Sequence, residues 1–110
     1  MAFVLFLVWF KLGLSETMSQ KQAFEAWTRE SKEAPKVIPR ERVKGLYKVA
    51  GKQELVALLD FDSHQALDEA ISKLTLQREA GHSLKLEITP LYPHADFIEY
   101  AKRALEDNLA

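Results

Sequence analysis

Cysteine is missing from this sequence of 110 residues, and neither sign of charge dominates. The lack of cysteine excludes disulfides, thiol nucleophiles and thiolate metal sites, and it suits a reducing cytoplasm, where we expect the protein to lie. The 15 basic and 16 acidic residues leave a net charge of −1. A chain without a basic excess has no electrostatic hold on nucleic acid, so we expect no nucleic-acid partner.

Long hydrophobic runs are also scarce, and the longest covers residues 2–10. A run of nine residues is too short for a membrane-spanning helix, which takes about 20. A signal peptide would have a basic residue before the run and small residues at a cleavage site after it. Met1-Ala2 and residues 11–14 supply neither. Because the run is rich in β-branched and aromatic residues, we predict a buried strand and no membrane partner.

Self-sufficient catalytic motifs are absent as well. The sequence has no GxSxG, no P-loop and no GxGxxG, so nothing in it supports a hydrolase elbow, a kinase or a dinucleotide enzyme. None of the three histidines, His64, His82 and His94, has a second histidine at metal-ligand spacing. We therefore expect neither a metal site nor a cofactor, and we interpret the histidines as surface or capping residues.

What the sequence does contain is a succession of strand and helix patterns. Apolar alternation and turn residues predict strands at residues 2–10, 42–49, 54–61 and 83–89. Apolar residues at helical spacing predict helices at residues 19–33, after Asp62-Ser63 and at 95–108, while residues 77–82 are predicted to form a polar loop.

The order strand–helix–strand–strand–helix–strand predicts an α+β domain of the ferredoxin-like type. Such a domain has a four-stranded antiparallel sheet with two helices on one face. We place this domain at residues 1–94. Residues 95–110 add a C-terminal helix, which we expect to pack on the domain or on a partner subunit.

The second face of the predicted sheet is too apolar to stay in water. The strand at residues 2–10 is apolar on both sides, and so is the strand at residues 54–61. Each large apolar side chain left in water forgoes about 1.5–3 kcal/mol. Four to six of them would forgo about 10 kcal/mol, as much as the whole stability of a domain. We therefore predict a homodimer in which a second copy covers this face.

Glu30 is the acidic residue that the helical pattern sets apart. It lies three residues after Trp27 and four before Ala34, at the border of the apolar stripe of the first predicted helix. Partial desolvation there raises the pKa of a carboxyl group and suits it to shuttle a proton. The alternative is a boundary glutamate that reaches solvent or pairs with a basic side chain.

A local run of basic residues surrounds the second predicted strand. A solvated strand edge explains such a run, and an anion-binding rim is the alternative. Its members are Lys36, Arg40, Arg42, Lys44, Lys48 and Lys52, interrupted by Glu41.

The stretch from Gly45 to Gly51, Gly-Leu-Tyr-Lys-Val-Ala-Gly, points to a family. Together with residues 55–63 and Ala66-Leu67, it resembles the muconolactone isomerases, which have an aromatic-basic-aliphatic-Ala-Gly turn, a strand ending in Asp and a helix starting near Ser. The resemblance covers about residues 3–94. It implies a dimeric α+β barrel, often assembled into larger rings, and cofactor-free proton transfer on a small anionic lactone in aromatic catabolism.

The resemblance also implies roles for individual residues. Glu30 falls over an acidic residue of the family's first helix and would be the base. Lys44 and Lys48 fall where the family carries basic residues that could meet a substrate carboxylate. Tyr47, at a tryptophan position, would form the wall of the pocket with Trp27. The helix predicted at residues 95–108 has no clear counterpart in the family.

Two other functions fit the same fold. A cofactor-free monooxygenase of the dimeric α+β barrel type would depend on the aromatic pocket more than on Glu30. A non-catalytic small-molecule-binding or assembly protein would keep the barrel without the chemistry. Fold alone does not choose among the three.

Overall fold

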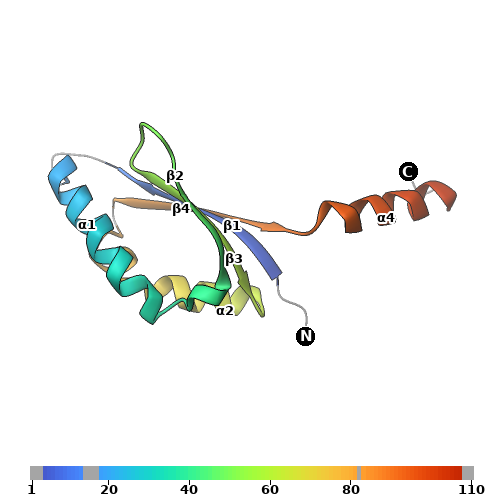
Figure 1. Cartoon of the computed structure of the whole chain (residues 1–110), viewed down its shortest axis with the longest axis horizontal. Helices are drawn as coiled ribbons and strands as arrows, with labels where there is room; N and C mark the ends of the chain where they lie inside the picture. Colours follow the sequence, from blue (N-terminus) through green and yellow to red (C-terminus); the bar gives the residue numbers. More distant parts are fainter. Residues whose placement is uncertain (1–3, 14–17, 82, 108–110) are drawn as a thin grey trace.

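A computed structural model describes residues 4–13, 18–81 and 83–107. It shows a curved sheet with helices on one face and a last helix that projects from the end of the sheet (Figure 1). The chain measures 57 × 28 × 20 Å, and its radius of gyration is 17.2 Å. A compact chain of this length would have a radius of gyration of about 13 Å, and the projecting helix accounts for the excess.

The strands and helices follow the predicted order. The four strands are β1 (Val4–Leu12), β2 (Val43–Lys48), β3 (Glu54–Phe61) and β4 (Leu84–Leu91). They form one antiparallel sheet in the order β2-β3-β1-β4. The helices are α1 (Gln20–Glu33), α2 (His64–Ser72), α3 (Thr75–Ala80) and α4 (His94–Glu106), with short 3-10 turns η1 (Ala34–Lys36) and η2 (Arg40–Arg42). The predicted ferredoxin-like α+β fold is confirmed.

The core lies between the inner face of the sheet and helices α1, α2 and α3. Alternate residues of the two central strands point into it because side chains of a strand alternate between faces. On β1 these are Phe6, Val8, Phe10 and Leu12, and on β3 they are Ala57, Leu59 and Phe61, all 8% exposed or less. The capping box of Ser19 and Gln22 starts α1, and the Ser63 side chain caps α2.

The outer face of the sheet holds the remaining residues of these strands. Leu5, Leu7 and Trp9 on β1, with Val56 and Leu58 on β3, are partly buried. Within the described ranges no helix covers them (Figure 1). The apolar outer face predicted from the sequence is thus present in the structure. That a second copy covers this face stays a prediction.

Two local predictions were wrong. Residues 77–80 are not a loop but belong to α3, because Leu76 and Ala80, four residues apart, are both buried on the core. The strand predicted at residues 83–89 does not end before Pro90, because β4 continues to Leu91 as an edge strand, where proline is tolerated.

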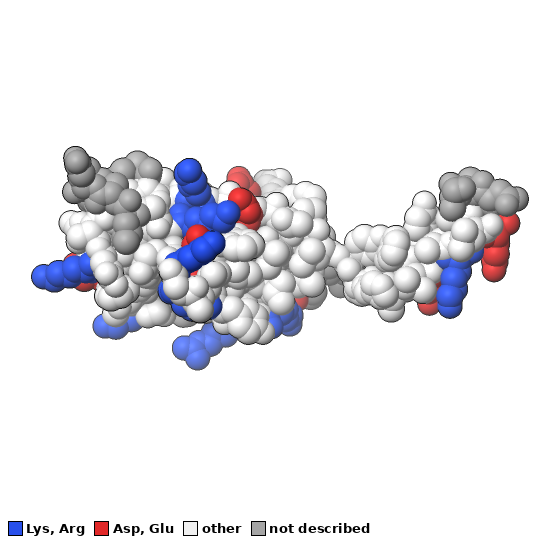
Figure 2. Space-filling view, turned by 90° about the horizontal axis from the view of Figure 1, so that it is seen from above, with Lys and Arg blue, Asp and Glu red and all other residues white. Residues whose placement is uncertain are grey.

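Helix α4 leaves the body of the protein through a narrow neck (Figures 1 and 2). Its side chains Phe97, Tyr100 and Leu105 are 45%, 53% and 66% exposed. Packing of residues 95–110 on the domain or on a partner subunit stays a prediction.

Candidate functional site

A cavity of about 470 Å³ lies between the inner face of the sheet and the end of α1. Its volume is in the range of sites for small organic molecules. The lining is mainly apolar and comes from both layers of the fold. It includes Phe10, Trp27, Ala34, Pro35, Ile38, Val43, Leu46, Leu55, Ala57, Leu59, Leu74 and Leu76. The polar residues that line it are Glu30, Ser31 and Arg40. We call it the Glu30 cavity.

Glu30 is the acidic group of this cavity, and it is only 8% exposed. It is buried because it continues the inward stripe of α1 at helical spacing after Ala23 and Ala26. Its Oε2 accepts a hydrogen bond of 2.6 Å from the backbone N–H of Leu76. Its Oε1 is buried and has no hydrogen-bond partner in the described part of the chain. One carboxylate oxygen is thus held in place and the other is left without a donor.

Burial raises the pKa of Glu30 above the ordinary value of a glutamate, because a charged carboxylate loses hydration inside the protein. The hydrogen bond from Leu76 opposes this rise, and so does the charge of Arg78. The nearby carboxylates Glu79 and Glu33 add to it. The desolvation effect dominates, so this carboxyl group takes up a proton more readily than a surface glutamate.

Glu30 also has a structural role at the start of α3. The residue at the N-cap of that helix is Leu74, whose side chain offers no acceptor. Glu30 supplies the acceptor from α1, because its Oε2 binds the N–H of Leu76 in the first turn. Glu30 therefore connects two helices while it lines the cavity.

Trp27 lies one turn before Glu30 on α1 and lines the same cavity. Its indole N–H donates a hydrogen bond of 2.9 Å to the side-chain oxygen of Gln53, next to β3. With its polar atom satisfied by Gln53, the ring adds apolar wall. The structure thus brings together two of the residues singled out from the sequence, Glu30 and Trp27.

The other three residues singled out from the sequence lie elsewhere in this chain. Tyr47 is on the outer face, paired with Val56 across the strands, and is 62% exposed. Lys44 is the extra residue of a bulge in β2, and its Nζ lies 3.4 Å from Oδ2 of Asp60. Lys48 donates to backbone carbonyls of the turn that follows β2. Their part in substrate binding stays a prediction.

Among the lining residues that sequence reasoning missed are Arg40 and Leu46. Strand alternation could have found Leu46, because it faces away from Tyr47 and pairs with the inward-facing Ala57. Arg40 was visible only as a member of the basic run.

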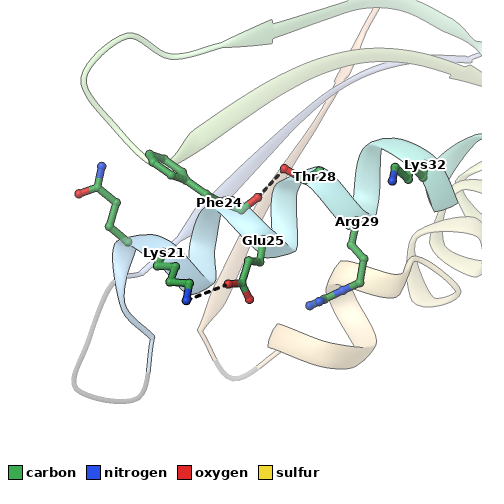
Figure 3. Close-up of a pocket in the computed structure, with 7 residues that line it drawn as sticks. Lys21, Phe24, Glu25, Thr28, Arg29 and Lys32 are labelled. Atoms are coloured by element: carbon green, nitrogen blue, oxygen red, sulfur yellow. Dashed lines mark hydrogen bonds and ion pairs between the residues drawn. The ribbon is translucent and has the colours of Figure 1, made fainter.

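A second, shallow hollow lies on the exposed side of α1 (Figure 3). Figure 3 shows Lys21 and Glu25 paired along the helix, 4.0 Å apart, and the Thr28 hydroxyl donating to the carbonyl of Phe24. The residues that line it all come from this one helix, and none of them is buried. Such a surface is typical of a solvated helix face.

Two kinds of feature are absent from the residues that the structure describes. Among these residues, no group of three or more histidine, cysteine or acidic side chains could hold a metal ion. No helix in the same ranges has the length and apolar character needed to cross a bilayer.

Comparison with known proteins supports the resemblance stated from the sequence. The family model of muconolactone delta-isomerase matches residues 4–96, which leaves most of α4 outside the match. A crystal structure of muconolactone isomerase shares 24% identity, covers 82% of this chain and 90% of its own, and superposes with a TM-score of 0.62. A structural genomics protein, YJCS, shares 9% identity, covers 84% of this chain and 100% of its own, with a TM-score of 0.52. No curated protein matches the sequence.

Proposed function

Because the chain belongs to the muconolactone delta-isomerase family, we propose that it is a cofactor-independent isomerase that moves a proton within a small anionic lactone. Glu30 is the base. The observation that carries this proposal is the setting of its carboxyl group, which is buried in an apolar cavity with Oε1 unpartnered in the described part of the chain. A carboxyl group in this setting favours the isomerase over the monooxygenase and the non-catalytic binding protein.

The raised pKa of Glu30 suits proton transfer, because a general base works best when its pKa lies near the working pH. In the proposed step, the Glu30 carboxylate removes a proton from the carbon beside the ring oxygen. The electron pair of the broken C–H bond moves into the conjugated carbonyl system. The carboxyl group then returns the proton two carbons away, so atoms and electrons balance without another reactant.

The walls of the cavity support this chemistry. Trp27, Phe10 and Leu76 line the same cavity as Glu30 and give it apolar surface. A substrate ring that fills this space excludes water, which protects a carbanionic intermediate from protonation by solvent. Since Oε2 is held by the Leu76 N–H, the base keeps a fixed orientation relative to the bound ring.

The test is a proton-exchange assay on muconolactone in deuterated water, with wild type and Glu30→Gln. The glutamine still accepts from Leu76 but cannot take a proton, so we expect the exchange rate to fall by about 10²–10⁴-fold. Glu25→Gln is the matched control, because Glu25 lies on the exposed side of the same helix and pairs only loosely with Lys21. Equal rates for wild type and Glu30→Gln would remove Glu30 from the mechanism.

We propose further that the protein works as a homodimer, with the outer face of the sheet as the interface. The support is the row of partly buried apolar residues on the two central strands, which no described helix covers, and the exposed ring of Tyr47 beside it. Apolar patches of this kind mark protein interfaces.

A further inference from the structure

The rim of the Glu30 cavity carries one positive charge. Among the described residues that line the cavity, Arg40 is the only cation. It is exposed to solvent, whereas Glu30 is buried. The cavity therefore has a charged, hydrated part at Arg40 and a desolvated acid at Glu30.

Arg40 differs from the nearest members of the basic run, Lys36, Arg42 and Lys44, in having no side-chain partner among the described residues. Nζ of Lys36 lies 3.0 Å from Oε2 of Glu33, and Nζ of Lys44 lies 3.4 Å from Oδ2 of Asp60. The guanidinium nitrogens of Arg42 lie 3.8 Å from Oδ1 of Asp60 and 3.8 Å from Oδ1 of Asp62. For Arg40, the described residues provide neither an ion pair nor a hydrogen bond to the guanidinium group. Its charge is thus available to a ligand without first breaking an internal contact.

The backbone holds Arg40 at this place. Pro39 precedes it with φ −57° and ψ 147°, and the N–H of Arg42 donates to the Pro39 carbonyl at 2.9 Å. Ile38, which is 7% exposed, anchors the segment in the core, and Val43 starts β2 directly after it. Both of these residues line the cavity. The side chain of Arg40 therefore starts from a fixed point on the rim.

We propose that Arg40 binds the carboxylate of the substrate at the rim and so orients the lactone ring toward Glu30. This inference rests on the proposed function and names the residue that recognises the anion. A guanidinium group donates two parallel hydrogen bonds to a carboxylate, a geometry that lysine cannot reproduce.

The opposite orientation is disfavoured by electrostatics. A substrate carboxylate at the Glu30 end would lose its hydration in an apolar cavity and would face the acidic group there. At the Arg40 end it stays partly hydrated and meets a positive charge. The site therefore selects small monoanions whose charge lies at one end and whose reactive ring is neutral.

Binding of the ring-saturated analogue of muconolactone, which cannot isomerise because it has no ring double bond, and of the methyl ester of this analogue, measured by calorimetry at fixed ionic strength, tests this role apart from turnover. The ester keeps the ring but has no charge. We expect wild type to bind the acid about tenfold more tightly than the ester, and Arg40→Gln to bring the two dissociation constants within about twofold of each other. Arg40→Lys should give an intermediate preference, because the charge stays and the planar fork is lost.

Lys52→Gln is the control, since it removes one positive charge of the same run at a residue that does not line the cavity. We expect it to keep the full preference for the acid. Equal binding of acid and ester by wild type, or a preference that survives in Arg40→Gln, overturns the inference. If Lys44→Gln or Lys48→Gln loses the preference for the acid while Arg40→Gln keeps it, the inference is wrong and the carboxylate binds at β2 instead.

Failure of the proposed function gives a different result. Glu30→Gln should still prefer the acid over the ester, because it leaves Arg40 in place. If Glu30→Gln exchanges protons as fast as wild type, the proposed base is wrong, while the preference set by Arg40 is measured independently.

Discussion

Replacing Glu30 by glutamine separates the ionisation of this group from its contact with α3. In wild type the pKa of Glu30 is raised in the folded state by burial. A raised carboxyl pKa means that the folded state holds its proton more tightly than the unfolded chain, where the pKa is about 4.3. Folding is then most favoured when Glu30 is protonated. Stability is lost as the pH rises from about 4 through the folded pKa, and the loss is complete above it.

The size of the effect follows from the contacts of the side chain. Each unit by which the folded pKa exceeds the unfolded one lowers the stability at neutral pH by about 1.4 kcal/mol. Domains have only about 5–15 kcal/mol of stability in all. In Glu30→Gln the amide oxygen still accepts from the Leu76 N–H, while the amide N–H₂ takes the place of Oε1, which has no hydrogen-bond partner among the described residues. That second effect costs about 1–3 kcal/mol and does not depend on pH.

Urea unfolding of wild type and Glu30→Gln between pH 4 and pH 8 measures both parts. All other titrating groups are common to the two proteins, so the difference in free energy of unfolding reports Glu30. We expect wild type to lose stability relative to the variant as the pH rises, and then to reach a constant difference. A difference that does not change with pH would refute the raised pKa, and one that moves in favour of wild type would show that the pKa is depressed.

Two further predictions concern the faces of the sheet. Leu58→Lys places a charge in the middle of the outer face, and we expect sedimentation to show that this variant is monomeric and wild type dimeric. Glu69→Lys, on the exposed side of α2, is the control and should stay dimeric. Dimers in both variants would contradict the proposed interface. Leu59→Ala empties a position that is 2% exposed and should cost about 2–5 kcal/mol in urea unfolding. Leu46→Ala, at a site 60% exposed, should cost well under half as much, and equal losses would contradict this account of the core.

The sequence was sufficient for the parts of the fold that depend on periodicity. The apolar stripe predicted for residues 19–33 placed Trp27 on the core side and Glu30 at its border, because three- and four-residue spacing keeps side chains on one face of a helix. In the structure both residues line the cavity. The same reasoning worked for the central strands. It is weakest for short elements, and α3 was missed because six residues give little periodic signal and its cap comes from Glu30, 46 residues away from Leu76.

The residues of β2 could not be placed from the sequence for a different reason. Between Val43 and Gly45 the register to β3 shifts, so Lys44 is an extra residue and the simple alternation of faces breaks there. Tyr47 and Lys48 were assigned from positions in the family pattern and not from the alternation of faces. Arg40 lies just before the strand, and only the tertiary structure shows that it lines the cavity.

The two flanks of the sheet limit how copies of this protein can meet. Where β1 and β4 meet, the N–H of Gly13 donates to the carbonyl of Ser83, so these two opposite residues form a hydrogen-bonded pair. Hydrogen-bonded and non-hydrogen-bonded pairs alternate along an antiparallel ladder. Pro90, which lies opposite Phe6, therefore belongs to a pair without mutual hydrogen bonds. The nitrogen of Pro90 therefore faces the free side of β4, where it has no hydrogen to donate. On the other flank the bulge at Lys44 interrupts β2. A strand of another copy cannot form a continuous hydrogen-bond ladder with either edge, which protects the protein against edge-to-edge aggregation. Copies can then associate through the faces of their sheets.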